Sequence, residues 1–583
     1  MSPDLRGIVL ANDVRGVAGE QLDEQVARAF GAAFADSLEV KDLILAHDMR
    51  DSSPALARAF ADGAARRGAR VGLAGLCATD ELYCASGLYR AAGAMITASH
   101  NPAPYNGIKF CLPGARPVGR DSGLEALRVR AEELLGEGEI PEVPGGHQEE
   151  LDCLEDYIAI LLHLVGIPAR RPLRVVVDAG NGMAGLTVPA LAERVPTLEL
   201  IGLHLDLDGS FPHHPADPTD PENLVELSAA VREHGADVGL AFDGDADRCV
   251  VVDETGAPVP PSALTALIAL AEIDRARAAG DQRPAVVANV VTSRHVRETV
   301  ESAGGRYVRT PVGHSYIKAV MADEHAVVGG EHSAHYYFRD FFNADSGLLA
   351  ALHVLAALAG GDRPMSELVA AHSPYAASGE KDLRVADAQA ARDTVRAAFE
   401  GRRGTEIDEL DGLTVTHWGD TGAATTGDAG TAIGTGDADD AVAAGHWWFS
   451  LRSSNTEPLL RLNVEAAEGT TMRAVRTEVL ALLGEGTGTA EQAEHDAASR
   501  STTAADGGAA QPSRPASAGS TEDALELPSW LREALRCPRC GASLVHDAEQ
   551  LICADDPSHV FEVRGGVPVL VPEGEVPGAE SHG

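Results

Sequence analysis

Three aspartates stand at alternate positions between two short apolar runs in the middle of this chain. The stretch is Asp243-Gly-Asp-Ala-Asp-Arg248, preceded by Val238 to Phe242 and followed by Cys249 to Val252. Short apolar runs that are bounded by polar turns favour buried strands, so the sequence predicts a strand, a carboxylate loop and a second strand. Such a loop collects oxygen ligands, which Mg²⁺ and Ca²⁺ both prefer.

The same spacing resembles the start of a calcium-binding helix-loop-helix, with Glu254 at the twelfth position. That interpretation fails at the sixth position, where the turn needs glycine and the chain has Arg248. The residues that follow, CVVVD, predict a strand rather than a polar loop. We therefore expect a strand-loop-strand Mg²⁺ site formed by Asp243, Asp245 and Asp247. Arg248 beside them favours an additional anion over a merely solvated turn.

A second polar stretch, Thr97 to Lys109 with the sequence TASHNPAPYNGIK, combines a hydroxyl, an imidazole, an amide and an ammonium group, although the whole chain has only four lysines. The small, apolar residues Ala91 to Ile96 before it predict a buried strand, and Asn101-Pro102 is a turn signal. Ser99 is therefore expected at the edge between strand and loop. On its own the stretch is more typical of a capped turn, and the other polar loops reverse that interpretation.

Two further polar loops follow in the chain. Arg452-Ser-Ser-Asn-Thr-Glu-Pro458 sets a bidentate donor beside hydroxyls and an amide, a group suited to hold a phosphate, with a plain loop as the alternative. Gly330-Glu-His-Ser-Ala-His335 precedes Tyr336-Tyr337-Phe338 and indicates a sugar-contacting loop that leads into a strand.

Taken in order, TASHNP, DGDADR, GEHSAH and RSSNTEP resemble the four active-site loops of the phosphohexomutase family, in its phosphomannomutase/phosphoglucomutase branch. The resemblance covers about residues 5 to 485 and implies four α/β domains around a central cleft, each of which contributes one loop. Departures from the family's usual pattern at Asn12, Val291 and Ala334 lie in substrate-contact regions and leave the sugar preference open.

The resemblance also implies roles for individual side chains. Ser99 would exchange a phosphoryl group with a hexose phosphate through hexose 1,6-bisphosphate, with Mg²⁺ held against it by the three aspartates. Lys109 resembles the family's proton-transfer residue, with His335 as a second one and His100 in support. The phosphate group that does not react would be bound by Arg452, Ser454, Asn455 and Thr456. The sugar hydroxyls would be bound by Glu331 and Ser333. The substrate more generally would be contacted by Arg15, Arg248, Lys318 and His314, and for His314 a plain loop histidine is the alternative.

Alternating strand and helix patterns predict α/β units with largely parallel sheets. In the first unit we expect a strand at Ile8 to Leu10, helices at Leu22 to Phe34 and Ala55 to Arg67, and strands at Asp42 to Ala46 and at Val71 to Leu73 before the serine loop. The expected domains are 1–150 with the serine loop, 151–255 with the metal loop, 256–370 with the sugar loop and 371–485 with the phosphate loop, then a linker at 486–524 and a small domain at 525–575.

One motif in the second predicted unit indicates a different class of enzyme. After the predicted strand Val175 to Asp178 comes Gly180-x-Gly182-x-x-Gly185, and Asp206 ends the next apolar run. This pattern matches the dinucleotide fingerprint, so a dehydrogenase is an alternative from a different class. It leaves the serine loop and the aspartate triplet unexplained, and glycine turns between strand and helix serve packing as often as pyrophosphate binding.

The formal net charge of −41 works against nucleic acid and anionic membranes as partners. The chain has no apolar run of eighteen residues, and its N-terminus, MSPDLRG, lacks the apolar segment of a secretion signal, so we expect a cytoplasmic protein. Five scattered cysteines without metal spacing are interpreted as reduced thiols, namely Cys77, Cys84, Cys111, Cys153 and Cys249.

The C-terminal end has a different composition. Residues 486–524 are rich in Ala, Ser, Thr, Gly and Gln, which predicts a flexible tether. In the segment 525–575, Cys537-Pro-Arg-Cys540 and Cys553 suggest a zinc ribbon, with His559 as the nearest candidate for a fourth ligand or packing alone in its place. The segment resembles the small zinc-ribbon proteins that partner tRNA and protein methyltransferases, which implies a docking module for a protein partner.

Two alternatives to a phosphomannomutase/phosphoglucomutase stay open. A phosphoglucosamine mutase is the closer one, and Asn455 beside Ser454 counts against it because that branch is expected to carry glycine there. The other is a non-catalytic scaffold whose tail recruits a methyltransferase. The presence of Ser99, Lys109 and the aspartates argues against scaffolding as the sole role.

Overall fold

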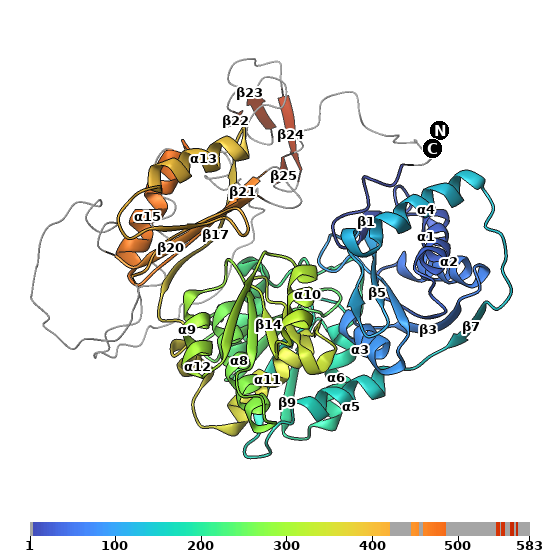
Figure 1. Cartoon of the computed structure of the whole chain (residues 1–583), viewed down its shortest axis with the longest axis horizontal. Helices are drawn as coiled ribbons and strands as arrows, with labels where there is room; N and C mark the ends of the chain where they lie inside the picture. Colours follow the sequence, from blue (N-terminus) through green and yellow to red (C-terminus); the bar gives the residue numbers. More distant parts are fainter. Residues whose placement is uncertain are drawn as a thin grey trace, which may run out of the picture. The chain divides into compact units, whose positions relative to one another are not determined.

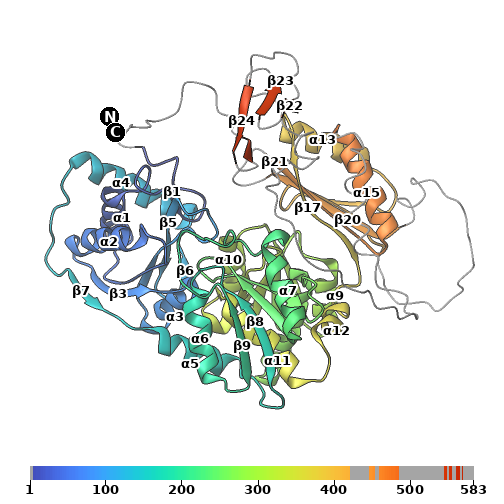
Figure 2. The same ribbon diagram turned by 180° about the vertical axis from the view of Figure 1, so that it is seen from behind.

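The computed structural model describes residues 4–419, 445–453 and 459–484 and, near the C-terminus, the strand residues 544–547, 550–553, 560–564 and 567–568. The chain divides into two compact units, Met1–Gly488 and Thr489–Gly583. Four sheets follow one another along the first unit, from blue to orange in Figures 1 and 2, and a fifth lies in the second unit. Within the described residues, no helix combines the length and the apolar character that a membrane span needs.

The first domain is a seven-stranded sheet with the order β1-β5-β4-β2-β3-β7 and β6 beside β5. Its elements are β1 (Val14–Val17), α1 (Glu24–Ser37), β2 (Asp42–His47), α2 (Ser53–Arg66), β3 (Arg70–Leu76), α3 (Thr79–Tyr89), β4 (Ala92–Ile96), β5 (Tyr105–Leu112), β6 (Arg116–Pro117), α4 (Leu124–Glu137) and β7 (His147–Glu150). Strands β4, β2, β3 and β7 are parallel to one another, whereas β5 runs antiparallel to both β4 and β1. Helices α1, α2 and α4 share an apolar core with one face of the sheet, and the residues of α3 are divided between two other clusters.

One prediction for this domain is wrong, and one helix was not predicted. The predicted strand at Ile8 to Leu10 is absent, since Val9 forms only an isolated bridge with Val14, where β1 begins. Ile8 and Val9 are nevertheless buried, so this apolar run marks core packing rather than a strand. Helix α3 was not predicted because its polar first turn, Thr79 to Glu81, is buried together with its apolar residues, which leaves no amphipathic pattern.

The second domain has the strand order β11-β10-β8-β9. Its elements are α5 (Leu154–Leu164), β8 (Leu173–Asp178), α6 (Ala184–Arg194), β9 (Leu198–Leu203), α7 (Val225–His234), β10 (Val238–Phe242) and β11 (Cys249–Asp253). Strands β10 and β11 are antiparallel neighbours, with Phe242 opposite Cys249. The predicted strand-loop-strand arrangement of the aspartate loop is thereby confirmed.

The glycine motif of this domain is explained by close packing. A Cβ atom at Gly182 would lie 2.7 Å from the carbonyl oxygen of Gly244, and one at Gly185 would lie 2.0 Å from that of Leu205. Gly180 has φ +51°, which glycine adopts at the lowest cost. Gly182 lets the turn after β8 approach the aspartate loop, Gly185 lets α6 approach Leu205, and neither role requires a nucleotide.

The third domain has the strand order β13-β12-β14-β15-β16. Its elements are α8 (Pro261–Ala278), β12 (Ala285–Asn289), α9 (Arg294–Ser302), β13 (Arg306–Thr310), α10 (His314–Glu324), β14 (Val328–Gly330), β15 (Tyr336–Phe338), β16 (Ala344–Asp345), α11 (Gly347–Gly360) and α12 (Met365–Ala370). The loop from Glu331 to His335 joins β14 to antiparallel β15, so the prediction of a polar loop leading into a strand is confirmed. His314, for which a plain loop histidine was the alternative to a substrate contact, is the first residue of α10, because Gly313 provides the turn before it.

The fourth domain is an antiparallel sheet with the order β17-β21-β20-β19-β18. Its elements are β17 (Ala376–Arg384), α13 (Ala388–Phe399), β18 (Glu406–Asp408), β19 (Leu413–His417), β20 (Trp447–Ser453), β21 (Leu459–Ala466) and α15 (Gly469–Leu482). Phe399 of α13 packs on Trp447 and Phe449 at ring-centroid distances of 5.7 and 5.0 Å, which places the aromatic core between helix and sheet.

The second unit contains a small antiparallel sheet in which neighbouring strands follow the chain. Its strands are β22 (Leu544–Asp547), β23 (Gln550–Cys553), β24 (Val560–Arg564) and β25 (Val567–Pro568). Cys553 is the last residue of β23, whereas Cys537, Cys540 and His559 lie outside the described residues.

Candidate active site

Ser99 follows strand β4 in a backbone conformation that is uncommon for any residue except glycine. Its φ is +50°, and its side chain is almost fully buried. The hydroxyl donates a hydrogen bond of 2.7 Å to Oδ2 of Asp243, and it lies 3.3 Å from Nδ1 of His100. A strained backbone persists only where the surrounding structure holds it, so the serine hydroxyl is fixed toward the aspartate loop.

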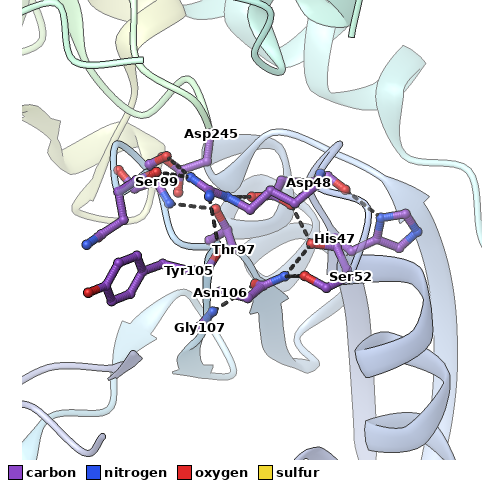
Figure 3. A network of polar contacts seen from close by, with 12 residues as sticks. His47, Asp48, Ser52, Thr97, Ser99, Tyr105, Asn106, Gly107 and Asp245 are labelled. Atoms are coloured by element: carbon purple, nitrogen blue, oxygen red, sulfur yellow. Dashed lines mark hydrogen bonds and ion pairs between the residues drawn. The ribbon is translucent and has the colours of Figure 1, made fainter. Parts of the chain in front are cut away.

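Arg50 supports the serine loop from its main-chain side. It is 1% exposed, and Nε donates to Oδ2 of Asp48 at 3.1 Å. Its two terminal nitrogens donate at 2.7 to 3.0 Å to four carbonyl oxygens of the loop, those of Ser99, Asn101, Pro102 and Tyr105. Figure 3 shows the polar network that contains Ser99, Thr97 and Asp48. The sequence did not identify Arg50 as a site residue, although the charged run His47-Asp-Met-Arg50, which begins at the last residue of β2, was an available signal.

The three aspartates form one buried cluster. One carboxylate oxygen from each of Asp243, Asp245 and Asp247 lies within 4.8 Å of the others. Lys109 Nζ donates to Oδ2 of Asp245 at 2.7 Å and to Oδ2 of Asp247 at 2.6 Å, and the Thr79 hydroxyl donates to Asp245 at 2.6 Å. Among the described residues, Oδ1 of Asp245 and Oδ1 of Asp247 have no hydrogen-bond partner. Buried oxygens without donors fit a hard divalent cation such as Mg²⁺.

The charges of this cluster shift the pKa values of its members. Burial alone would lower the pKa of Lys109, but Asp245 and Asp247 outweigh it and raise that pKa well above its ordinary value. Burial raises the pKa of Asp243 to about 8, against the opposing charge of Arg248. Lys109 therefore carries its proton here and neutralises part of the carboxylate charge.

Two arginines meet the serine loop and the aspartate loop. Arg248 Nε donates to Oδ2 of Asp243 at 3.0 Å, and its Nη1 lies 3.5 Å from Asp217. Its Nη2 is buried and has no hydrogen-bond partner among the described residues, which fits an anion beside Ser99. Arg15 pairs with Asp13 at 2.8 Å and donates to the Asn101 side chain at 2.9 Å.

The predicted sugar loop contributes one residue to this cluster. His335 Nε2 lies 3.6 Å from Oδ1 of Asp247, and its Nδ1 is 3.0 Å from the Ser333 hydroxyl. Glu331 is buried, and both of its oxygens accept hydrogen bonds within the third domain, from Tyr337 and from other donors that include the Gly313 main chain. Its proposed contact with sugar hydroxyls stays a prediction.

The remaining predicted residues pair with other side chains, although Asp345, the partner of Lys318, lies beside Asp247 and His335. Lys318 is buried and pairs with Asp345 at 2.7 Å, and burial together with the Lys318 charge lowers the pKa of His314 to about 4. Arg452 is buried and pairs with Glu380 at 2.9 Å. Ser454, Asn455 and Thr456 lie outside the described residues. The structure thus gathers Ser99, His100, Lys109, Arg248, His335 and the three aspartates.

A buried serine hydroxyl beside a carboxylate cluster and an unpartnered guanidinium nitrogen, on a multi-domain α/β scaffold, is typical of proteins that transfer phosphoryl groups with the help of a divalent cation.

Comparison with known proteins narrows this class. Residues 7–133, 155–256 and 260–375 match the alpha/beta/alpha domains I, II and III of the phosphoglucomutase/phosphomannomutase family, and residues 380–482 match its C-terminal domain. The chain is 38% identical to "Phosphohexose mutases" of Xanthomonas campestris pv. campestris over 476 residues, which cover 81% of this chain and 98% of that protein. A phosphomannomutase of Salmonella typhimurium is 36% identical, with coverage of 81% and 98%.

The solved structures agree with these relatives. A phosphoglucomutase/phosphomannomutase family protein of Burkholderia thailandensis has a TM-score of 0.70 and 29% identity, covering 83% of this chain and 99% of that one. The chain belongs to the phosphoglucomutase/phosphomannomutase family.

Proposed function

We propose that this protein is a phosphohexomutase that moves phosphate reversibly between the 6- and 1-positions of mannose or glucose. The transfer runs through a phosphoserine at Ser99 and a hexose 1,6-bisphosphate intermediate. The 2.7 Å hydrogen bond between Ser99 and Asp243 carries the proposal, because it joins a buried loop serine to the carboxylate cluster of a chain from this family.

The residues around Ser99 fit the needs of phosphoryl transfer. Asp243, Asp245 and Asp247 would hold Mg²⁺, which when bound neutralises charge on the transferring group. Arg248, with its unpartnered Nη2, binds and orients the phosphoryl oxygens. Lys109 carries its proton and is placed to donate it, and His335 is the second candidate for proton transfer.

The same site must accept both phosphates of the bisphosphate in turn. We assign the phosphate that does not react to Arg452 with Ser454, Asn455 and Thr456, and the sugar hydroxyls to Glu331 and Ser333. Arg452 pairs with Glu380 through Nη2, and its buried Nε has no hydrogen-bond partner among the described residues, so the guanidinium keeps a donor for phosphate. The departures at Asn12, Val291 and Ala334 are the positions to change when sugar preference is tested.

Turnover of mannose 1-phosphate and of glucose 1-phosphate, with Mg²⁺ and a trace of hexose bisphosphate, tests the proposal. Ser99→Ala is expected to lower kcat by at least about 10³-fold, because the phosphoryl carrier is lost. Ser302→Ala, a change at an exposed serine that ends α9, serves as the matched control. Retention of full turnover by Ser99→Ala excludes the phosphoserine route.

We further propose domain boundaries near residues 150, 255, 370 and 485, a tether at 486–524, and a partner-docking domain at 525–575 that uses Cys537, Cys540 and Cys553 for Zn²⁺. The antiparallel sheet from β22 to β25 and the cysteine spacing support this assignment. Buried free thiols at Cys77, Cys84, Cys111, Cys153 and Cys249 support a reducing, cytoplasmic location. Zinc content and protein capture, compared between the full chain and one ending at residue 485, test the tail.

A further inference from the structure

A cluster of histidines lies outside the site described above. It is found at the carboxyl ends of the parallel strands β8 and β9. The imidazole rings of His204 and His213 are stacked with their centroids 3.9 Å apart, and the ring of His214 is 5.4 Å from that of His204. One ligand atom from each of Asp178, His204 and His214 lies within 4.8 Å of the other two. The proposed phosphoryl transfer uses none of these side chains.

The hydrogen bonds of His214 define which ring nitrogen is available. Its Nδ1 is 2.8 Å from the carbonyl oxygen of Pro215, which only accepts, so Nδ1 carries the hydrogen. The lone pair on Nε2 of the neutral ring then faces Oδ2 of Asp178 at 3.1 Å. Two acceptors approach this closely only when a proton or a metal cation lies between them.

Asp178 is itself oriented for this contact. The main-chain N–H of Gly180 donates to its Oδ1 at 2.9 Å, which leaves Oδ2 for the imidazole. The carboxylate is 1% exposed, so it lies in surroundings where an unshared negative charge is costly.

The other two histidines follow a related pattern. His213 Nδ1 is 2.9 Å from the amide oxygen of Asn181, and His204 Nε2 is 3.0 Å from Oε2 of Glu226. Metal-binding histidines are oriented in this way, with one ring nitrogen held by a protein acceptor and the other directed to the metal. The Glu226 side chain is 58% exposed, so solvent reaches the cluster at this carboxylate.

We propose that Asp178, His204 and His214 bind a divalent first-row transition metal such as Zn²⁺, Co²⁺ or Ni²⁺, with Glu226 at the rim of the site. Imidazole nitrogen together with one carboxylate suits these ions, whereas Mg²⁺ and Ca²⁺ prefer sites made of oxygen alone. The site is therefore chemically distinct from the aspartate cluster beside Ser99.

The segment 204–214, which carries two of the proposed ligands, also contacts Arg50, the residue that supports the serine loop. The Arg50 guanidinium lies 5.0 Å from the centre of the Phe211 ring, and a Cβ atom at Gly209 would lie 2.4 Å from Cα of Arg50. A metal held by His204 and His214 braces residues 204–214 at both ends. Binding is therefore expected to stabilise the folded chain as well as to fill the site.

Cobalt titration of the metal-stripped full-length chain, in excess Mg²⁺ to occupy the aspartate cluster, tests the proposal. We expect one equivalent of Co²⁺ with the visible bands of nitrogen and oxygen ligation, without thiolate charge transfer, and a higher melting temperature. His204→Ala and His214→Ala are each expected to weaken this binding by more than the ~10- to 100-fold that loss of an outer-shell partner costs, because each removes a ligand. His163→Ala, at an exposed histidine of α5, is the matched control and is expected to bind as the parent does.

The same titration distinguishes cobalt bound by the histidine cluster from cobalt bound by the C-terminal cysteines or by the aspartate cluster. Serine in place of Cys537, Cys540 and Cys553 is expected to leave the nitrogen and oxygen signal intact. Loss of that signal in the triple variant, its displacement by Mg²⁺, or parental affinity in both histidine variants would overturn the proposal. The proposal would also be overturned if the parent chain bound no cobalt outside the aspartate cluster. That result would mean that a shared proton joins His214 to Asp178.

A second measurement on the parent chain keeps the test valid if a histidine variant does not fold or if the protein has no mutase activity. Electron paramagnetic resonance of the parent chain with Cu²⁺ is expected to show coupling to imidazole nitrogen, and its absence also contradicts the site even if a histidine variant fails to fold. Because binding is read directly, an inactive Ser99 would leave this result unchanged.

Discussion

The guanidinium of Arg50 donates a hydrogen bond of 2.8 Å to the carbonyl oxygen of Ser99. The hydroxyl of the same serine donates to Asp243 in the second domain. The main chain of Ser99 is thus held by the first domain and its side chain by the second, which stabilises the left-handed φ of +50°. The position of the serine oxygen therefore depends on a residue that makes no contact with its hydroxyl.

Replacing Arg50 with lysine tests this support. An ammonium group keeps the charge but cannot make the four carbonyl contacts of the planar guanidinium. We expect kcat to fall by on the order of 10²-fold with a smaller change in KM, because a displaced nucleophile weakens the transition state more than substrate binding. Arg58→Lys, at an exposed arginine of α2, is the control, and equal kcat values in the two variants would refute the role of Arg50.

Thr79 is expected to tune the Mg²⁺ site through Asp245. Its hydroxyl donates to Oδ2 of Asp245 at 2.6 Å, and its main-chain N–H donates to the Asp245 carbonyl at 3.0 Å. Thr79→Val keeps the shape and removes the hydroxyl hydrogen bond, so the Mg²⁺ concentration for half-maximal activity should rise about 10- to 100-fold. At saturating Mg²⁺ the turnover number should approach that of the parent. Thr394→Val, on α13, is the control, and an unchanged Mg²⁺ requirement for Thr79→Val would contradict this prediction.

Asp80 is expected to make the stability of the protein depend on pH. Its Oδ2 accepts hydrogen bonds from Tyr157 at 2.7 Å and from Ser346 at 2.6 Å, which joins α3 to α5 and to the start of α11. Burial raises the pKa of this carboxyl to about 8, although the two hydroxyl donors oppose the effect.

The direction of this pH dependence follows from the number of protons that the folded and unfolded states bind. In the unfolded chain the carboxyl titrates near pH ~3.9, so between that value and about 8 the folded state binds more protons than the unfolded state. The contribution of Asp80 to stability is therefore largest at low pH and is lost as pH rises through about 8. Asp80→Asn mimics the protonated side chain and should flatten this part of the profile. Melting temperatures across the pH range, with the exposed Asp274→Asn as control, check this, and an unchanged slope in Asp80→Asn would count against it.

Much of the fold follows from local pattern. An apolar run between polar turns predicted β10 with its observed bounds, because the strand is short and ends where polar residues begin. The aspartate loop and the turn after Ser99 were also predictable, since the chemistry lies in consecutive residues. The resemblance of the four loops predicted the family before any contact between them was known.

Other features depend on contacts between distant segments. Helix α3 buries Thr79 and Asp80 because Asp245, Tyr157 and Ser346 lie against it, and no local periodicity records those partners. Arg50 acts on a loop about fifty residues further along the chain, so its role required the folded arrangement. The histidine cluster likewise combines Asp178 and His214, which are 36 positions apart.

The most direct measurement is the site of phosphate attachment. The full-length chain is incubated with Mg²⁺ and hexose 1,6-bisphosphate, digested, and the peptide that contains Ser99 is examined by mass spectrometry before and after addition of a hexose monophosphate. We predict phosphate on Ser99 that is lost to the sugar at a rate at least equal to kcat. Phosphate on another residue, or phosphate on Ser99 that the sugar does not remove, would contradict a phosphoserine mutase.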